Sequence, residues 1–460
     1  MSTAVIKVAL VGHTNTGKTS LLRTLIRDTQ FGEIANRAST TRHVEGTALL
    51  VDGQPMIAFY DTPGLEDSIS LLEHLEQSGE PQDWVARIEQ FLNSEDAQQT
   101  FAQEAKSLRQ IVACDVVIYV IDVREQVLGK YRDELTLLIR SARPVIPLLN
   151  FIDSPAARNE QWRQHLIRLG LHASLGFNPL ISDAQAERRL FEKMRALNDG
   201  LYEPLGQVMA DLDQRRNRLR RVAADLIADL LIDVAAYAPP VTQDNAQALE
   251  DTRRELAAQV REREWHSASE MLKTFGFNQG DYAPEDVFIH TAADGHTWLT
   301  LASLKHLGIR SSSGIAAGAS AGLAADLLVG GLSLGVGAAT GAALGGMYRL
   351  RAQSRLLMMH LRGQTPIYVS NATLYQLAAR QLTLADGLLR RGHAAVHPLR
   401  LDATLLEQYR HCIELAPPEV LAQARVTPSW SGLIGPALGR EREAARQHLT
   451  TALEQLLDTE

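Results

Sequence analysis

A loop bounded by two glycines is the first part of the chain whose residues could do chemistry. It reads Gly12-His13-Thr14-Asn15-Thr16-Gly17-Lys18-Thr19. The spacing G-x-x-x-x-G-K-[ST] lets consecutive main-chain N–H groups wrap around a phosphate. Lys18 would add a cation at the β- and γ-phosphates, and the Thr19 hydroxyl would coordinate Mg²⁺. We therefore expect a phosphate site whose contacting residues are Asn15, Thr16, Gly17, Lys18, Thr19 and Ser20.

A second motif, Asp61-Thr62-Pro63-Gly64, directly follows the apolar residues 57–60. A carboxylate at the end of a strand beside the phosphate loop can hold Mg²⁺ through water. Gly64 leaves the backbone free to meet a γ-phosphate. We therefore expect Asp61 to bind Mg²⁺ through water and Gly64 to contact the reacting γ-phosphate.

A third motif follows the apolar residues 147–149 and contains Asn150 and Asp153. The Asp153 carboxylate can accept two hydrogen bonds, from N1–H and the exocyclic amine of guanine. Adenine does not offer this pair of donors, so a carboxylate left unpaired would penalise ATP. These residues therefore predict binding of GTP and GDP.

These motifs require a scaffold that brings their ends together. Residues 5–11, 57–60, 113–122 and 147–150 form apolar runs typical of strands buried on both faces of a parallel sheet. Residues 20–26 read as a helix with one apolar face, directly after the first loop. We predict an α/β domain over residues 1–185, with a mostly parallel sheet and helices on both faces, and a mainly helical remainder.

The three motifs together resemble translation-factor-related P-loop GTPases of the Era and MnmE (TrmE) type, and the resemblance covers residues 1–185. It implies GTP hydrolysis with Mg²⁺. In this family a threonine of the first switch closes over the metal; Ser39-Thr40-Thr41-Arg42-His43 matches that segment, with Thr41 preferred and Thr40 as the alternate. The last guanine loop is matched best by Ser182-Asp183-Ala184, where Asp183 and Ala184 would contact the base. The implied catalytic set is Lys18, Thr41 and Gly64.

Two positions depart from relatives of this family. Phe151 stands where many carry a lysine whose stem stacks on the base, and an aromatic ring can also stack there. Leu65 stands where Ras-like enzymes have the glutamine that orients water, so we expect slow intrinsic hydrolysis. In MnmE-like members the residue at Asn15 helps to hold K⁺. One hypothesis is that K⁺ stimulates hydrolysis, and the alternative is that Asn15 only braces the loop.

The second switch continues into an insertion, and the pattern predicts helices between Leu71 and Leu108. Because this stretch follows Gly64, nucleotide state could move it. The equal alternative is static packing.

Residues 186–280 are expected to form a connector of two antiparallel helices, over 186–238 and 245–275, interrupted at Pro239-Pro240. The run 215–221 carries five arginines, which suit a salt-bridged, solvated helix face better than RNA or anionic lipid. The RNA-binding module of Era is not recognisable, so RNA is a disfavoured partner that stays open.

Residues 281–460 are expected to form a mainly helical domain containing a glycine- and alanine-rich hairpin over 314–346. Glycines at four-residue spacing align on one helix face and permit close helix packing. Three interpretations remain: a buried hairpin of a soluble domain, a hairpin that enters a membrane or mediates self-association, and a flexible linker.

The bulk composition excludes few function classes. The 460 residues carry a net charge of −8, with 45% hydrophobic and 22% charged residues, which indicates a globular chain without general affinity for nucleic acid. The N-terminus has no secretion signal pattern, and Cys114 and Cys412 match no disulfide or metal spacing and are expected to be buried. We expect a cytoplasmic protein, with a peripheral or inserted position at the inner membrane as the alternative.

The whole arrangement resembles bacterial GTPases fused to an uncharacterised C-terminal domain. We predict a nucleotide-dependent switch that acts on an unknown protein partner or a membrane through its helical half. The alternatives are a membrane-associated, self-assembling GTPase and an Era-like factor for RNA or ribosome assembly.

Overall fold

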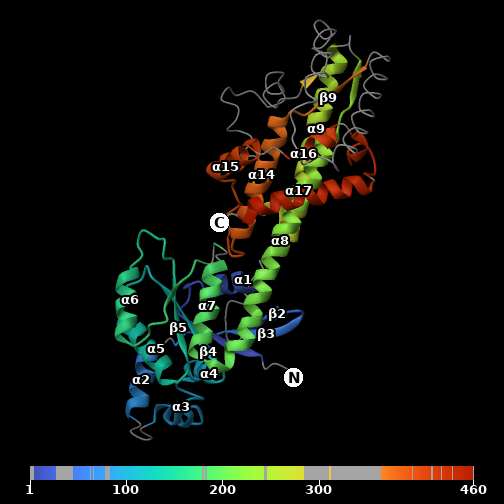
Figure 1. The fold of residues 1–460 in the computed structure, drawn as a ribbon. Coiled ribbons are helices and arrows are strands. Elements are labelled where there is room, and N and C mark those ends of the chain that lie inside the picture. Colours follow the sequence, from blue (N-terminus) through green and yellow to red (C-terminus); the bar gives the residue numbers. More distant parts are fainter. Residues whose placement is uncertain are drawn as a thin grey trace. The chain divides into compact units, whose positions relative to one another are not determined.

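A computed structural model describes most of the chain. The described residues are 5–26, 45–62, 64–65, 67–77, 83–178, 181, 184–242, 246–283, 310–311, 364–395, 397–415, 418–425, 427–437 and 439–458. Thr40, Thr41, Ser182, Asp183 and the segment 314–346 lie outside them. The chain divides into two compact units (Figure 1): Met1–Arg216 with Arg390–His397, and Asn217–Leu389 with Pro398–Glu460.

The first unit is built on a six-stranded sheet in the order β2-β3-β1-β4-β5-β6. Its strands are β1 (Ile6–Val11), β2 (Glu45–Val51), β3 (Gln54–Asp61), β4 (Val116–Asp122), β5 (Val145–Asn150) and β6 (Leu175–Gly176). All neighbours pair in parallel except β2 and β3. That hairpin turns at Asp52 and Gly53, whose φ angles of 49° and 76° suit the right-handed twist of the two strands. The predicted mostly parallel sheet is confirmed, although the sequence interpretation did not include β2 or β6.

Helices cover both faces of this sheet because alternate strand residues point to opposite sides. One face packs on α1 (Lys18–Ile26), α7 (Ala184–Leu197) and the first turns of α8 (Tyr202–Ala236), through strand residues that include Val8, Leu10, Ile118 and Val120. The other packs on five helices through residues that include Ala9, Val11, Val117 and Tyr119. These helices are α2 (Ser68–Gln77), α3 (Trp84–Leu92), α4 (Ala102–Val112), α5 (Gly129–Arg140) and α6 (Asn159–Arg168).

The insertion after Gly64 is helical, as the sequence predicts, and consists of α2, α3 and α4. Asp83 caps the N-terminus of α3 by accepting hydrogen bonds from the backbone N–H groups of Val85 and Ala86. The buried face of the three helices, which includes Leu71, Phe91 and Leu108, belongs to the same hydrophobic cluster as one face of the sheet.

The second unit is mainly helical, as predicted. It contains the later part of α8, α9 (Ala246–Thr274), α14 (Asn371–Arg390), α15 (Ala403–Leu415), α16 (Glu419–Arg425) and α17 (Arg440–Asp458), with the short 3₁₀ turns η3 (Gln279–Asp281) and η6 (Pro428–Trp430). The small strands β7 (Pro240–Thr242), β8 (Arg310–Ser311) and β9 (Gln364–Tyr368) form an antiparallel sheet in the order β7-β9-β8. Within the part of the chain that the structure describes, no helix combines the length and apolarity needed to cross a bilayer.

Helices α8 and α9 run antiparallel, because Arg263 bonds to Asp233 while Ser267, one turn later, bonds to the earlier residue Leu226. An antiparallel pair is therefore present, but its first member is α8 alone. The residues before it form the separate helix α7, which packs on the sheet of the first unit. Helix α8 ends shortly before Pro239-Pro240, since proline cannot continue the backbone hydrogen bonds of a helix.

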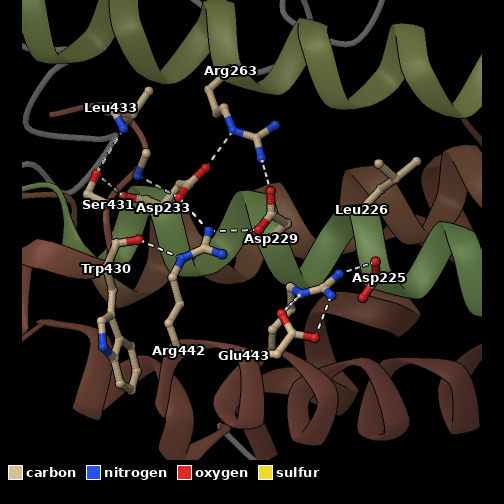
Figure 2. A network of polar contacts seen from close by, with 12 residues as sticks. Asp225, Leu226, Asp229, Asp233, Arg263, Trp430, Ser431, Leu433, Arg442 and Glu443 are labelled. Carbon is tan, nitrogen blue, oxygen red and sulfur yellow. Dashed lines mark hydrogen bonds and ion pairs between the residues drawn. The ribbon is translucent and has the colours of Figure 1, made fainter. Parts of the chain in front are cut away.

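A closed ring of ion pairs joins three helices of the second unit (Figure 2). Arg263 of α9 donates to Asp233 over 2.8 Å and to Asp229 over 2.7 Å, both on α8. Arg442 of α17 donates to the same two carboxylates over 2.8 and 2.7 Å. The Asp233 side chain is only 5% exposed, so its charge depends on these partners.

Two smaller sequence expectations can also be compared with the structure. Arg220, from the basic run 215–221, is only 12% exposed and pairs with Asp458 of α17 over 2.7 Å, so this arginine contacts another helix instead of lying on a solvated face. Cys114 is buried, but the expectation was wrong for Cys412, which is exposed on α15. The apolar residues of α15 that reach the core are Tyr409 and Ile413, which leaves Cys412 on the solvent side.

Candidate functional site

The carboxyl ends of the parallel strands gather the three sequence motifs at one edge of the sheet. In the strand register, Leu10 of β1 lies opposite Asp61 of β3, and Asp122 of β4 lies opposite Asn150 of β5. Ligands of open parallel sheets bind outside this edge, where loops from neighbouring strands meet. The first loop, the acid motif and the Asn150 motif are therefore neighbours, although long stretches of sequence separate them.

The first loop needs both of its glycines. Gly12 and Gly17 have φ angles of 150° and 95°, in a region that disfavours residues with a side chain. A Cβ atom on Gly12 would lie 2.5 Å from the Val120 carbonyl oxygen. Asn15 also has a positive φ of 65°, which asparagine tolerates better than most residues. The loop thus keeps a conformation that places its backbone at the start of α1.

Lys18 folds back over this loop. Its ammonium donates to the carbonyl oxygens of Gly12 over 2.7 Å and His13 over 2.9 Å. Burial lowers the pKa of Lys18, while the negative charges of Asp61 and Glu134 act in the opposite direction. The ammonium therefore sits in a partly desolvated position where a further negative group would stabilise its charge.

The acid motif reaches the same place from β3. The Thr62 N–H donates to the Leu10 carbonyl over 2.9 Å, which continues the β1–β3 pairing to the end of the strand. A Cβ atom on Gly64 would lie 3.2 Å from the Gly12 carbonyl oxygen, so the turn passes close beneath the loop. Thr19, in the first turn of α1, and Asp61 supply oxygen atoms of the kind that Mg²⁺ prefers.

The Asn150 motif is tied to the first loop by its side chain. The Asn150 amide donates to the Thr16 carbonyl over 2.8 Å, and its oxygen accepts the Phe151 N–H over 2.8 Å. A Cβ atom on Gly17 would lie 2.2 Å from the Asn150 nitrogen, so only glycine permits this approach. Asn150 itself is buried.

The Phe151 ring has a cation on one side. The Arg124 guanidinium lies 3.8 Å from the ring centroid, a cation–π distance. Two parallel hydrogen bonds, of 2.9 and 2.6 Å, fix Arg124 to the Asp122 carboxylate. The backbone of Phe151 is left-handed, with φ of 62°, which turns the chain sharply after β5. The ring is therefore held in place both by its backbone and by Arg124.

Asp153 is exposed and accepts a hydrogen bond from the Asn178 side-chain amide over 3.0 Å. Asn178 lies two residues after the end of β6, whose residue Gly176 pairs with Leu149, so the two strand ends are adjacent. Of the other predicted contacts, Ala184 begins α7, whereas Thr41 and Asp183 lie outside the described residues.

Sequence reasoning missed Arg124, Asn178 and Glu134, which contact the predicted site residues. Glu134 carried a detectable signal, because it falls on the apolar stripe of α5 formed by Tyr131, Leu135 and Leu138. A carboxylate at such a buried position requires a hydrogen-bond or ion-pair partner. Arg124 and Asn178 carried no comparable signal, since polar residues after a strand are common in loops.

Two family models match separate parts of the chain. The family model described as "50S ribosome-binding GTPase" matches residues 7–151, and the one described as "Domain of unknown function (DUF3482)" matches residues 163–455. The protein "Translation initiation factor IF-2" of Geotalea daltonii is 28% identical over 185 residues, which are 40% of this chain and 16% of that protein. The protein of the same name from Pelobacter propionicus is 27% identical over the same shares. The chain thus spans 16% of the length of these curated relatives.

Two solved structures are also similar to the chain. Era in complex with MgGDPNP and nucleotides 1506–1542 of 16S ribosomal RNA is 20% identical, with a TM-score of 0.28, covering 42% of this chain and 57% of that one. The bacterial selenocysteine-specific elongation factor EF-Sec is 16% identical, with a TM-score of 0.28, covering 42% and 28%.

Proposed function

We propose a function from two premises: this chain belongs to the family described as Domain of unknown function (DUF3482), and its N-terminal domain is a P-loop GTPase domain related to translation factors. The proposal is that the protein binds GTP, hydrolyses it to GDP and phosphate with Mg²⁺, and acts as a nucleotide-dependent switch. The meeting of the three motifs at one sheet edge, tied together by the Asn150–Thr16 hydrogen bond, carries this proposal.

Each motif has a separate task in this proposal. The backbone N–H groups of the first loop and the start of α1 bind the phosphates, because a helix N-terminus attracts anions. Lys18 leaves its carbonyl partners to contact the β- and γ-phosphates. Asn150 holds the loop, and Asp153, oriented by Asn178, accepts the guanine donors.

Thr19 and Asp61 would hold Mg²⁺, with Thr41 added from the resemblance to Era-like proteins. The bound ion would neutralise charge on the phosphate oxygens. The chain supplies no glutamine after Gly64, because Leu65 stands there and is fully buried. We therefore propose slow intrinsic hydrolysis.

Asn15 is the proposed contact for K⁺. It is exposed and lies on the turn of the loop, where its side chain could contribute an oxygen ligand beside the phosphates. Hydrolysis rates are to be compared in K⁺ and Na⁺ buffers of equal ionic strength. Equal rates would remove the K⁺ hypothesis and leave the rest of the proposal standing.

The helical C-terminal half is the part of the chain that we propose transmits the nucleotide state to a partner. Binding of GTP would order the Thr41 and Gly64 segments, and the helical half would pass this change to a protein partner. A pull-down with GDP and with a non-hydrolysable GTP analogue would identify that partner. Recovery of the same proteins in both nucleotide states would contradict a switch.

A role at the ribosome is the second candidate, favoured by the description of the family that matches residues 7–151. Co-sedimentation with ribosomal subunits, in each nucleotide state, tests it. Membrane association or self-association through residues 314–346 also remains a proposal, because that segment lies outside the described residues. Sedimentation with liposomes, with and without nucleotide, tests it.

The central experiment is a titration of the full-length protein with GTP, GDP and ATP in the presence of Mg²⁺. Tight binding of both guanine nucleotides and weak binding of ATP are expected. Lys18→Ala should lose most phosphate affinity, and Asp153→Asn should weaken guanine binding. Lys273→Ala, an exposed lysine of α9, is the matched control and should bind like the wild type. Tight ATP binding, or no binding of any guanine nucleotide, would contradict the proposal.

A further inference from the structure

A buried acid lies next to the phosphate site and belongs to none of its motifs. Glu134 is in the middle of α5, and its side chain is 0% exposed. A carboxylate is costly to bury unless several donors compensate for the lost water. The partners of Glu134 therefore indicate why it is there.

Those partners come from three separate segments. Oε1 accepts the Leu65 N–H over 3.1 Å, and Oε2 accepts the Tyr119 hydroxyl over 2.5 Å. Oε2 also lies 3.2 Å from Nε2 of His13, within ion-pair distance. Burial and the neighbouring Glu134 charge raise the pKa of Tyr119 well above its usual range, so its hydroxyl keeps the proton that it donates.

Two of these segments are parts of the proposed phosphate site. His13 directly follows Gly12 in the first loop, and Leu65 directly follows Gly64 in the acid motif. A Cβ atom on Gly64 would lie 3.6 Å from the His13 Cα, so the two segments touch. The His13 ring also packs edge-on against Tyr131 of α5, with centroids 4.9 Å apart. Glu134 thus anchors both segments to one helix.

The contact at Leu65 is the one that bears on hydrolysis. The Leu65 side chain is fully buried and has no polar atom, so it cannot orient water. Its N–H belongs to the peptide that joins Gly64 to Leu65, and the bond to Glu134 fixes the plane of that peptide. Because that peptide directly follows Gly64, the bond to Glu134 restrains the backbone next to the residue that is proposed to act at the γ-phosphate.

We propose that Glu134 is a positioning residue for GTP hydrolysis. It holds the Gly64–Leu65 peptide and His13 in fixed positions relative to each other, beside the γ-phosphate. This inference rests on the proposed function. Glu134 does not contact the nucleotide in this scheme; it acts through Leu65 and His13. Because the Glu134 carboxylate and the phosphates carry like charges, replacing it with a neutral group removes a repulsion and should not weaken phosphate binding.

The test compares binding and hydrolysis in Glu134→Gln. Glutamine keeps the shape but removes the negative charge, and its amide nitrogen takes the place of one of the two acceptor oxygens. Either the Leu65 N–H or the Tyr119 hydroxyl therefore loses its charged acceptor. Single-turnover hydrolysis should slow by about tenfold, the effect of one lost hydrogen bond to a charged group. The Kd for a fluorescent GDP analogue should stay within about threefold of the wild type, a difference below 1 kcal/mol.

Two further variants make the result decisive. Asp133→Asn removes the neighbouring carboxylate of α5, which pairs with Arg132, and should hydrolyse GTP like the wild type. Tyr119→Phe keeps the Glu134 charge and removes one donor; it should slow hydrolysis less than Glu134→Gln and leave GDP affinity intact. If Glu134→Gln does not fold, Tyr119→Phe decides the question.

A merely structural role predicts a different pattern. In that case Glu134→Gln would lose thermal stability, nucleotide affinity and hydrolysis together, or would hydrolyse GTP at the wild-type rate; either result overturns the inference. If the wild-type protein binds no guanine nucleotide, the proposed function itself fails. If the wild type binds and hydrolyses GTP but the variants hydrolyse it equally fast, only the role of Glu134 fails.

Discussion

The side-chain amide of Asn150 donates a hydrogen bond to the backbone carbonyl of Thr16 over 2.8 Å, across 134 positions of sequence. The bond joins the end of β5 to the first loop just before Gly17. The same Asn150 side chain also accepts the Phe151 N–H, so it fixes the start of the Asn150 motif as well. One buried residue thereby sets the spacing between the proposed phosphate site and the proposed base site.

Replacing Asn150 should therefore weaken binding of every guanine nucleotide. Asn150→Ala leaves the Thr16 carbonyl and the Phe151 N–H without their partner, and affinity for GTP and GDP should fall together by about ten- to hundredfold. Calorimetric titration measures this. Asn93→Ala, which removes an exposed amide bonded to Glu89 in α3, is the control and should have no effect on affinity. Unchanged affinity in Asn150→Ala would show that the loop holds its position without this bond.

Glycine at position 17 should be indispensable for a steric reason. In Gly17→Ala the new methyl group would meet the Asn150 nitrogen at 2.2 Å, so the loop or the Asn150 motif must move. Gly53→Ala is a matched control, because Gly53 also has a positive φ, of 76°, but nothing lies within 4 Å of its Cβ position. Both variants should lose about 1 kcal/mol of stability from backbone strain. Only Gly17→Ala should lose nucleotide binding in the same titration, and similar binding by the two variants would refute the steric argument.

The Phe151 ring should contribute to base binding by stacking. Phe151→Ala removes an aromatic contact worth about 0.5–1.5 kcal/mol, so the Kd for GDP should rise by up to about tenfold. Phe151→Lys should retain most of the affinity, since relatives of the Asn-Lys-x-Asp type stack a lysine stem on the base. Fluorescence titration with a labelled GDP tests both. Equal affinity in wild type and Phe151→Ala would mean that the ring only packs on Arg124.

The ion-pair ring should contribute strongly to the free energy of unfolding of the second unit. Asp233→Ala leaves Arg263 and Arg442 facing each other with one carboxylate fewer, and breaking a buried pair costs about 3–5 kcal/mol. Urea unfolding followed by circular dichroism measures the loss.

Asp225 provides the comparison for that experiment. It lies two turns earlier on α8, is 37% exposed, and pairs with Arg446, which also pairs with Glu443. Exposed pairs of this kind contribute about 1 kcal/mol or less. Asp225→Ala should therefore destabilise the protein much less than Asp233→Ala, and equal losses would argue that burial does not decide the strength of the network.

Most of the fold and the proposed location of the phosphate site follow from local sequence patterns. The runs that became β1, β3, β4 and β5 are apolar because parallel strands are buried on both faces, and the loop at residues 12–19 needs its glycines for backbone reasons alone. Helix α9 begins and ends close to its predicted limits of 245 and 275, because a periodic apolar face and a preceding proline are local signals. Strand β6 was missed because two residues carry no pattern, and β2 was missed although it has seven residues.

The sequence by itself determined which residues could bind phosphate, metal and guanine, because each motif places its reactive groups within a few positions of one another. Only the tertiary structure decided how these motifs are held together. The contacts of Asn150 with Thr16, Arg124 with Phe151, and Glu134 with His13 and Leu65 join segments from different strands and helices. Such contacts depend on strand order and register, which set distances in space that no local spacing encodes.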